Sequence, residues 1–189
     1  MILDSLLIFF YLQYLTLIFN VQQHENKGIC FMRKVVFLTS LIMLSLPSYA
    51  AVNCNGVLKN KSILESIKIK KKCTLENLII HGDVILEDGA IAELNNNHIK
   101  GNVIASSKFR TFSATDNLIQ GHVRLSQGKN IDLKDNTVKG NLSLQNNTGV
   151  VKIYANQING NLNCNRNAFT INGSKNMVSG NKQMQCQTF

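Results

Sequence analysis

The chain has 189 residues, which suffices for one domain and hardly for two. It holds one proline and no tryptophan, and asparagine fills 23 of the 139 positions from Ala51 onward, so a collagen-like chain and a proline-rich linker are excluded. The formal charge is +9. Regularly spaced Ile, Val and Leu interrupt the asparagines, which makes a disordered polar tract the weaker interpretation.

Residues 32–50 have the pattern of a secretory signal. A positive Met-Arg-Lys segment at 32–34 precedes an apolar stretch at 35–46, and Ser48-Tyr49-Ala50 fits a small-x-small cleavage site. The apolar stretch is shorter than the roughly 17–25 residues that a membrane span needs. We therefore predict export, with cleavage after Ala50 and a mature chain that does not span a membrane.

A second apolar stretch, residues 6–21, lies before the signal and is interrupted by Gln13. It is long enough to be a membrane anchor. A complete signal sequence needs no hydrophobic leader, however. We therefore favour translation from Met32, with residues 1–31 an upstream extension of the reading frame.

Residues 51–74 are expected to form a basic N-terminal cap with the first coil. From Ala51 onward the chain has 17 Lys and Arg against nine Asp and Glu, a formal charge of +8. Much of this charge is local, in Lys59, Lys61, Lys68, Lys70, Lys71 and Lys72. A basic patch attracts nucleic acid, anionic lipid or acidic polysaccharide. We favour the alternative that these lysines protect the open edge of the first coil from pairing with another chain.

Residues 75–181 carry a repeat that is marked by glycines. The intervals between successive glycines are 19, 20, 19, 20 and 20 residues, for Gly82, Gly101, Gly121, Gly140, Gly160 and Gly180. The phrase around each glycine recurs, as in Asn97-His-Ile-Lys-Gly-Asn102 and Asn156-Gln-Ile-Asn-Gly-Asn161. A fixed period of this length is typical of a solenoid.

Apolar residues recur at fixed distances from each glycine and alternate with polar ones. The column two residues before the glycine is Ile80, Ile99, Ile119, Val138, Ile158 and Val178, and the column four residues after it is Leu86, Ala105, Leu125, Leu144, Cys164 and Met184. Alternation with a period of two indicates strands with one buried face. We predict an all-β, single-domain, right-handed parallel β-helix of about six coils, with three short strands per coil.

The corners of each coil are expected at the asparagine and the glycine. Glycine tolerates positive φ, and asparagine tolerates left-handed geometry and bonds nearby backbone. Asparagines stacked on one another can also form amide ladders.

Four cysteines remain after the predicted cleavage, as expected for an exported protein with disulfides. Cys54 lies one coil length, 19 residues, before Cys73, and stacked positions about 4.8 Å apart fall within disulfide range. We predict Cys54–Cys73 there. Cys164 and Cys186 are 22 residues apart, so a bond between them requires the C-terminal cap, residues 182–189, to bend back over the last coil. A zinc site lacks the CxxC spacing that would support it.

The closing segment resembles the carboxy-terminal signature of a loose group of exported bacterial proteins. Those proteins pair N-x-V-x-G-N-L-x-C with a later N-x-V-x-G-N-K-x-x-Q-C, and residues 156–164 and 176–186 are similar to these motifs. The resemblance implies a parallel β-helix and an exported bacterial setting, and it brings no activity. The coil length is also similar to that of bactofilins, pectate lyases and polygalacturonases.

Two groups of residues are candidates for chemistry. Asp116 and Asp135 both stand five residues before a glycine, so they should stack at one corner and could bind calcium or share acid–base work in glycoside cleavage. The favoured alternative is an Asx-type turn at each. His81, His98 and His122 fall near successive glycines and could hold a metal, although their positions in the repeat differ. No cofactor is indicated.

Aromatic residues are few from Ala51 onward. Phe112 occupies a core column, Phe169 is expected to join it, and Tyr154 is expected to point outward. Basic and aromatic residues are not interleaved as in single-strand nucleic-acid binders, so no nucleic-acid partner is expected.

We therefore expect an exported structural or binding protein, a monomer, that uses a flank of the solenoid to contact an acidic polysaccharide or another envelope component. The alternative is a small polysaccharide-active enzyme of the lyase or hydrolase type. That alternative rests on analogy of fold, which is a weak warrant.

Overall fold

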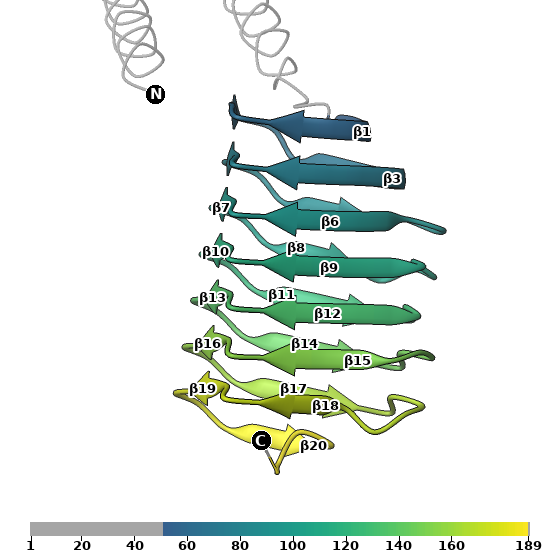
Figure 1. The fold of residues 1–189 in the computed structure, drawn as a ribbon, viewed down its shortest axis with the longest axis vertical. Coiled ribbons are helices and arrows are strands. Elements are labelled where there is room, and N and C mark those ends of the chain that lie inside the picture. The colour runs from purple at the N-terminus through teal and green to yellow at the C-terminus, as the bar shows by residue number, and fades with distance from the viewer. Residues whose placement is uncertain (1–50, 189) are drawn as a thin grey trace, which may run out of the picture. The chain divides into compact units, whose positions relative to one another are not determined.

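The structure is a computed structural model that describes residues 51–188. The predicted signal, its cleavage after Ala50 and the extension at residues 1–31 lie outside these residues. Residues 51–188 form an all-β parallel solenoid with three strands per turn (Figure 1). The near strands run leftward and the far strands rightward while the chain descends, which makes the coil right-handed, as predicted.

Three faces surround the core. The long-strand face contains β1 (Val52–Lys59), β3 (Ile67–Glu76), β6 (Ile91–Asn95), β9 (Thr111–Thr115), β12 (Asn130–Lys134), β15 (Val151–Tyr154) and β18 (Asn172–Ser174). The rear face contains β5 (Val84–Leu86), β8 (Val103–Ala105), β11 (Val123–Ser126), β14 (Leu142–Gln145), β17 (Leu162–Asn165) and β20 (Lys182–Met184). The short-strand face contains β2 (Ser62–Ile63), β4 (Ile79–Ile80), β7 (His98–Ile99), β10 (Leu118–Ile119), β13 (Thr137–Val138), β16 (Gln157–Ile158) and β19 (Met177–Val178).

Every strand pair between turns is parallel, and from the pairing of β3 with β6 and of β4 with β7 onward the register follows the repeat of 19 or 20 residues. Ile119, for example, lies beside Ile99 on one side and Val138 on the other. Strand β3 runs through two faces, pairing with β5 through Ile67–Ile69 and with β6 through Lys72–Glu76. The long-strand and rear faces therefore form one 13-stranded sheet, and the short-strand face forms a seven-stranded one.

The number of turns is about seven rather than the predicted six, because one strand of the seven-stranded sheet belongs to each turn. The additional turn comes from β1 and β2, which from Gly56 onward pair with β3 and β4 at a 17-residue offset, as in Leu58 with Leu75 and Ile63 with Ile80. No glycine marks this turn. Glu65 occupies the place above Gly82, and with no described turn above it a side chain fits there.

The predicted core columns are buried. Ile99, Val103, Leu94, Leu144 and Ile158 have a relative exposure of 0%. Met184 is an exception, because it lies in the last turn, has a positive φ of 55° and is 59% exposed. The alternation of apolar and polar residues thus produced the core where a further turn lies below, and not at the end of the stack.

The repeat glycines serve a purpose other than the predicted positive φ. None of the six has a positive φ. The left-handed conformation is found instead at other corner residues, such as Asn77, Asn96 and Asp116. A Cβ added at Gly121, Gly140, Gly160 or Gly180 would lie 2.5–2.7 Å from the carbonyl oxygen of the preceding glycine. Glycine is therefore needed because successive turns approach each other closely at this corner.

The predicted asparagine ladder is present and buried. It runs through Asn97, Asn117, Asn136, Asn156 and Asn176. The backbone N–H and the Nδ2 of each asparagine donate to Oδ1 of the next, at 2.9–3.1 Å. Each Nδ2 also donates to a backbone carbonyl of the preceding turn, as Asn136 does to Ala114 at 2.7 Å. Both the oxygen and the NH₂ group of each buried side-chain amide therefore have hydrogen-bond partners, as buried polar groups generally do.

Both predicted disulfides are formed. Cys54–Cys73 and Cys164–Cys186 have Cα separations of 5.8 and 5.4 Å. At the N-terminal end a register shift in β1 between Cys54 and Gly56 brings the first sulfur over Cys73. At the C-terminal end the tail bends back as predicted, and the Gln185 N–H donates to Cys164 O at 2.9 Å. Each clamp thus fixes one end of the stack.

The C-terminal clamp also closes a second amide ladder, which the sequence analysis missed. The N–H of Gly128 donates to Asn147 Oδ1, that of Asn147 to Asn167 Oδ1, and that of Asn167 to Gln185 Oε1, at 3.0, 3.2 and 2.9 Å. The 20-residue spacing of Asn147 and Asn167 was the available signal.

Candidate functional site

The two predicted acidic residues lie at the corner between the long-strand and short-strand faces. Asp116 and Asp135 are exposed, and both have a φ of 55°. They continue a column that begins with Asn60, Asn77 and Asn96. Asn77 Nδ2 donates to Asn60 Oδ1 at 3.2 Å and Asn96 Nδ2 donates to Asn77 Oδ1 at 2.7 Å. Asp135 lies 3.6 Å from the Nζ of Lys134. This position in the repeat calls for a left-handed residue, a conformation that Asn and Asp adopt more readily than most residues.

The three predicted histidines lie in different columns and have different partners. His81 Nδ1 is 3.5 Å from Lys100 Nζ, and His98 Nε2 is 2.8 Å from Gln120 Nε2. His122 takes the place that Asn102 and Asn141 have in other turns, and its Nδ1 accepts the Asn141 N–H at 2.9 Å. Within residues 51–188, no group of three or more His, Cys, Asp or Glu residues is placed to hold a metal ion.

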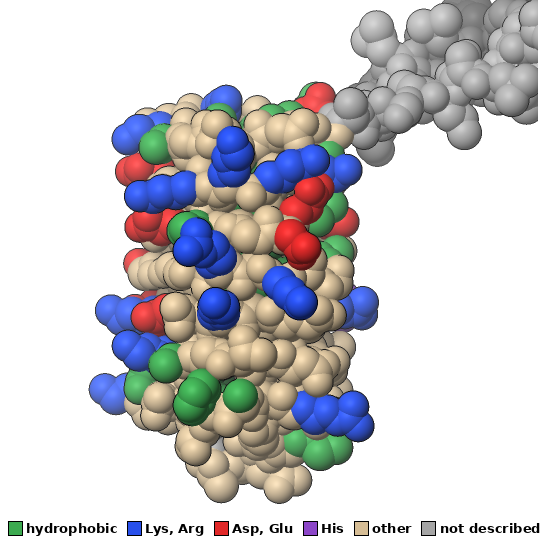
Figure 2. Space-filling model, turned by 90° about the vertical axis from the view of Figure 1, so that its right-hand side faces the viewer, with side chains coloured by type: hydrophobic (Ala, Val, Ile, Leu, Met, Phe, Trp, Pro, Cys, Tyr) green, Lys and Arg blue, Asp and Glu red, His purple; other side chains and the backbone are tan. Residues whose placement is uncertain are grey.

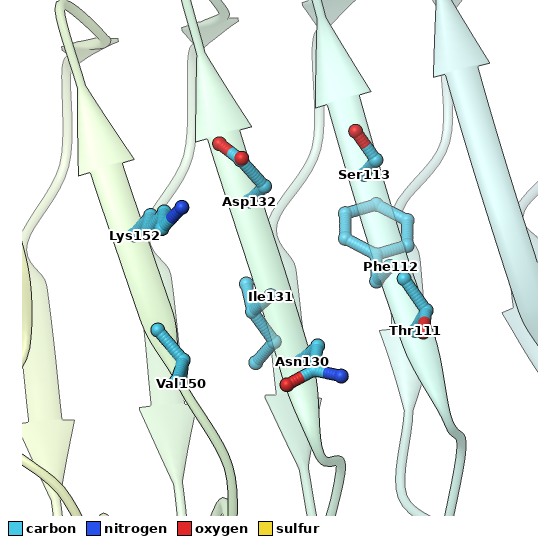
Figure 3. Close-up of a pocket in the computed structure, with 8 residues that line it drawn as sticks. All are labelled: Thr111, Phe112, Ser113, Asn130, Ile131, Asp132, Val150 and Lys152. Carbon is cyan, nitrogen blue, oxygen red and sulfur yellow. The ribbon is translucent and has the colours of Figure 1, made fainter.

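One hollow in the surface lies on the long-strand face, with a volume of about 460 Å³. Figure 3 shows Ser113, Asp132 and Lys152 side by side on β9, β12 and β15, while Phe112 and Ile131 alternate with them. Asp132 is the one carboxylate among the eight lining residues. Glycoside cleavage by the common mechanisms needs two carboxylates that flank the scissile bond, so this hollow lacks half of that machinery.

The N-terminal lysine stretch is not where the net charge resides. Residues 51–93 hold six lysines and six acidic residues, whereas residues 94–189 hold eleven Lys or Arg and three Asp, so the whole formal charge of +8 belongs to the second part. Stacking brings opposite charges together in the first turns, where Lys59 lies 3.4 Å from Glu76 and Lys70 lies 3.3 Å from Glu87. Such exposed pairs add little stability, but they neutralise two of the six lysines.

A second hollow lies at the corner between the rear and long-strand faces, which we call the loop corner (residues 106–110, 127–130 and 146–150). Its volume is about 310 Å³, and it is lined by Lys108, Phe109, Gln127, Lys129, Asn146 and Thr148. Figure 2 looks onto this edge and shows Lys and Arg side chains down the face, with the Asp and Glu side chains confined to its upper and middle parts. The loop corner therefore contains a hollow that is lined in part by positively charged side chains.

Sequence reasoning did not identify the loop corner, because its cations are not consecutive. Arg110 and Lys129 are 19 residues apart and precede β9 and β12 directly. Their spacing, equal to one coil, was the signal that could have found them.

Two of the three predictions for aromatic residues hold. Phe112 is buried and Tyr154 lies on the outward column with Lys134. Phe169 was expected inside but is 57% exposed. It lies in the longer loop before β18, where the regular alternation of the strands does not apply.

Compared with models of protein families, with curated proteins and with solved structures, the chain matches none of them. In the part of the chain that the structure describes, no helix has the length and apolar character to cross a membrane. The two disulfides are consistent with a periplasmic or extracellular location.

Proposed function

We propose that this protein is an exported β-helix that acts by binding rather than catalysis, and that the flank of its solenoid contacts an anionic component of the cell envelope. The observation that carries the proposal is the separation of charge along the chain. Residues 94–189 have eleven cationic residues against three acidic ones. A surface with this excess attracts polyanions over distances up to about 10 Å at ordinary salt.

The signal pattern at residues 32–50 and the paired cysteines support export. The resemblance of the closing segment to exported bacterial proteins points in the same direction, and it remains an expectation. The shape of the surface supports binding rather than catalysis. Successive repeat glycines are only 19 or 20 residues apart, which leaves no room between them for the long loops that would build a cleft. Rigid, stacked turns present side chains at fixed positions, which lowers the entropy that binding costs.

The test uses the exported form of the full chain, recovered from an expressing bacterium and mixed with isolated envelope fractions. We expect it to sediment with anionic fractions at low salt and to be released at high salt, since screening weakens attraction between exposed charges. Released sugar ends are assayed in parallel, and none are expected. Sugar release that disappears in Asp116→Asn or Asp135→Asn would replace this proposal with the enzymatic alternative.

A further inference from the structure

The cations of the loop corner lie on successive turns. Arg110 directly precedes β9 and Lys129 directly precedes β12, while Lys108 stands two residues before Arg110. The strands that they precede are paired in parallel through Asn130 and Thr111. Neighbouring strands are about 4.8 Å apart, so Lys108 and Arg110 on one turn and Lys129 on the next form a cationic cluster that extends over two turns along the solenoid axis.

The residues beneath the hollow are tightly packed. The Phe109 ring is buried at 1% exposure, and it occupies the space in which a side chain of Gly128 would lie. Lys108 and Lys129 line the hollow from neighbouring turns. The amides of Gln127 and Asn146 and the hydroxyl of Thr148 line the same depression.

The loop-corner cations have no carboxylate partner among the described residues. None of Lys108, Arg110 and Lys129 makes an ion pair there, in contrast to Lys59 and Lys70. The Asp88 carboxylate is engaged by the backbone N–H of Lys108 at 2.9 Å. All three cationic side chains belong to exposed residues and are available to an external anion.

We infer that the loop corner binds an acidic polysaccharide that lies along the solenoid axis, an inference that rests on the proposed function. A polymer with a carboxylate or sulfate on each sugar presents neighbouring anions to the cations of the two turns, and Lys and Arg both form charge-assisted hydrogen bonds with such groups. Gln127 Nε2 donates to Ser106 O at 3.3 Å and Thr148 Oγ1 donates to Gly128 O at 3.4 Å, so Gln127 Oε1 and Thr148 Oγ1 are left to accept hydrogen bonds from sugar hydroxyls, and the Asn146 amide can both donate and accept. An acidic sugar chain thus has partners both for its anionic groups, in the cations, and for its hydroxyls, in the uncharged polar side chains.

Nucleic acid fits this corner less well. Binding of single strands relies on cations interleaved with exposed aromatic rings on which bases stack. The ring at the hollow, Phe109, is buried. The exposed Phe169 lies in the loop before β18, two turns beyond Lys129, so the ring and the cations are not interleaved.

The test compares two double variants with the same change of net charge. Lys108→Glu with Lys129→Glu reverses the loop corner, and Lys100→Glu with Lys139→Glu reverses two exposed lysines at the opposite edge, next to β7 and β13 (Figure 1). Affinities of the exported form for polygalacturonate, alginate and neutral dextran are measured by titration calorimetry at moderate salt, about 0.1 M. Circular dichroism and thiol titration check that each variant keeps its fold and disulfides.

We expect the wild type to bind the acidic polymers and not dextran. The loop-corner variant should bind at least about tenfold more weakly, and the opposite-edge variant less than about threefold more weakly, because close charges dominate over distant ones at moderate salt. Equal losses in both variants would overturn the site and leave the proposed function standing. Tighter binding to RNA or to anionic lipid vesicles than to either acidic polymer would overturn the partner class, and failure to sediment with any envelope fraction would overturn the proposed function as well.

Discussion

The buried asparagine ladder makes a quantitative prediction at Asn136, in the middle of the stack. Its Oδ1 accepts from the N–H and the Nδ2 of Asn117, at 3.0 and 2.9 Å. Its Nδ2 donates to Ala114 O, Lys134 O and Asn156 Oδ1, at 2.7, 2.9 and 3.0 Å. Asn136 is only 2% exposed, so water cannot take the place of a partner that is removed.

Three substitutions separate the contributions. Asn136→Ala leaves the Asn117 N–H without its acceptor and opens a small cavity, which together cost about 3 kcal/mol of unfolding free energy. Asn136→Leu leaves the same N–H unsatisfied but fills the space, as Leu78 does at this position in its own turn, and we expect a cost of about 2 kcal/mol. Asn136→Asp retains the acceptor but turns a buried negative charge toward three oxygen atoms, at a cost of about 4 kcal/mol or more.

The assay is urea unfolding of the exported form with both disulfides intact, followed by circular dichroism. Asn159→Ala is the control, because Asn159 is exposed, and it should change stability by less than about 0.5 kcal/mol. The reasoning fails if Asn136→Ala costs less than about 1 kcal/mol, or if Asn136→Asp is milder than Asn136→Leu.

Three further predictions concern the corners and the ends. Gly140→Ala should cost about 3 kcal/mol in the same assay, because the new Cβ meets a backbone carbonyl that cannot move aside; Gly89→Ala, where nothing lies within 4 Å, should cost about 1 kcal/mol through its positive φ alone. Replacing Cys164 and Cys186 by serine should cost about 3 kcal/mol, and hydrogen exchange should accelerate mainly in residues 165–186; a uniform acceleration would contradict the role of this disulfide as an end clamp. His122→Asn should leave stability unchanged within about 0.5 kcal/mol, since asparagine serves as acceptor in the neighbouring turns, whereas His122→Ala should cost about 1 kcal/mol; equal costs would show that the acceptor is unimportant.

The pattern of the sequence was sufficient for the core because each turn repeats the same local chemistry. Alternation with a period of two places Ile99 and Ile119 inside wherever turns lie above and below them, and a constant coil length stacks like on like. The same constancy predicted the asparagine ladder and the bond between Cys54 and Cys73. It failed at the end of the stack, where Met184 is exposed, and in the irregular loop of Phe169.

The candidate site was less accessible to this reasoning. A run of lysines is conspicuous in the sequence, yet Glu76 and Glu87 lie one turn away from Lys59 and Lys70 and neutralise them. Conversely, Lys108 and Lys129 are separated by 20 intervening residues, and they share a hollow only because the coil brings their turns together.

The sequence by itself determined the architecture and the coil length, because these follow from a repeat whose period equals one turn. It also indicated the two disulfides, through an even number of cysteines in a chain with an export signal. The tertiary structure decided which charges are paired and which face outward together, because charge pairing depends on neighbours one turn away. It also decided why the repeat glycines are required: at Gly140 the carbonyl oxygen of Gly121 occupies the space that a side chain would need, a restraint between turns that no local backbone preference contains.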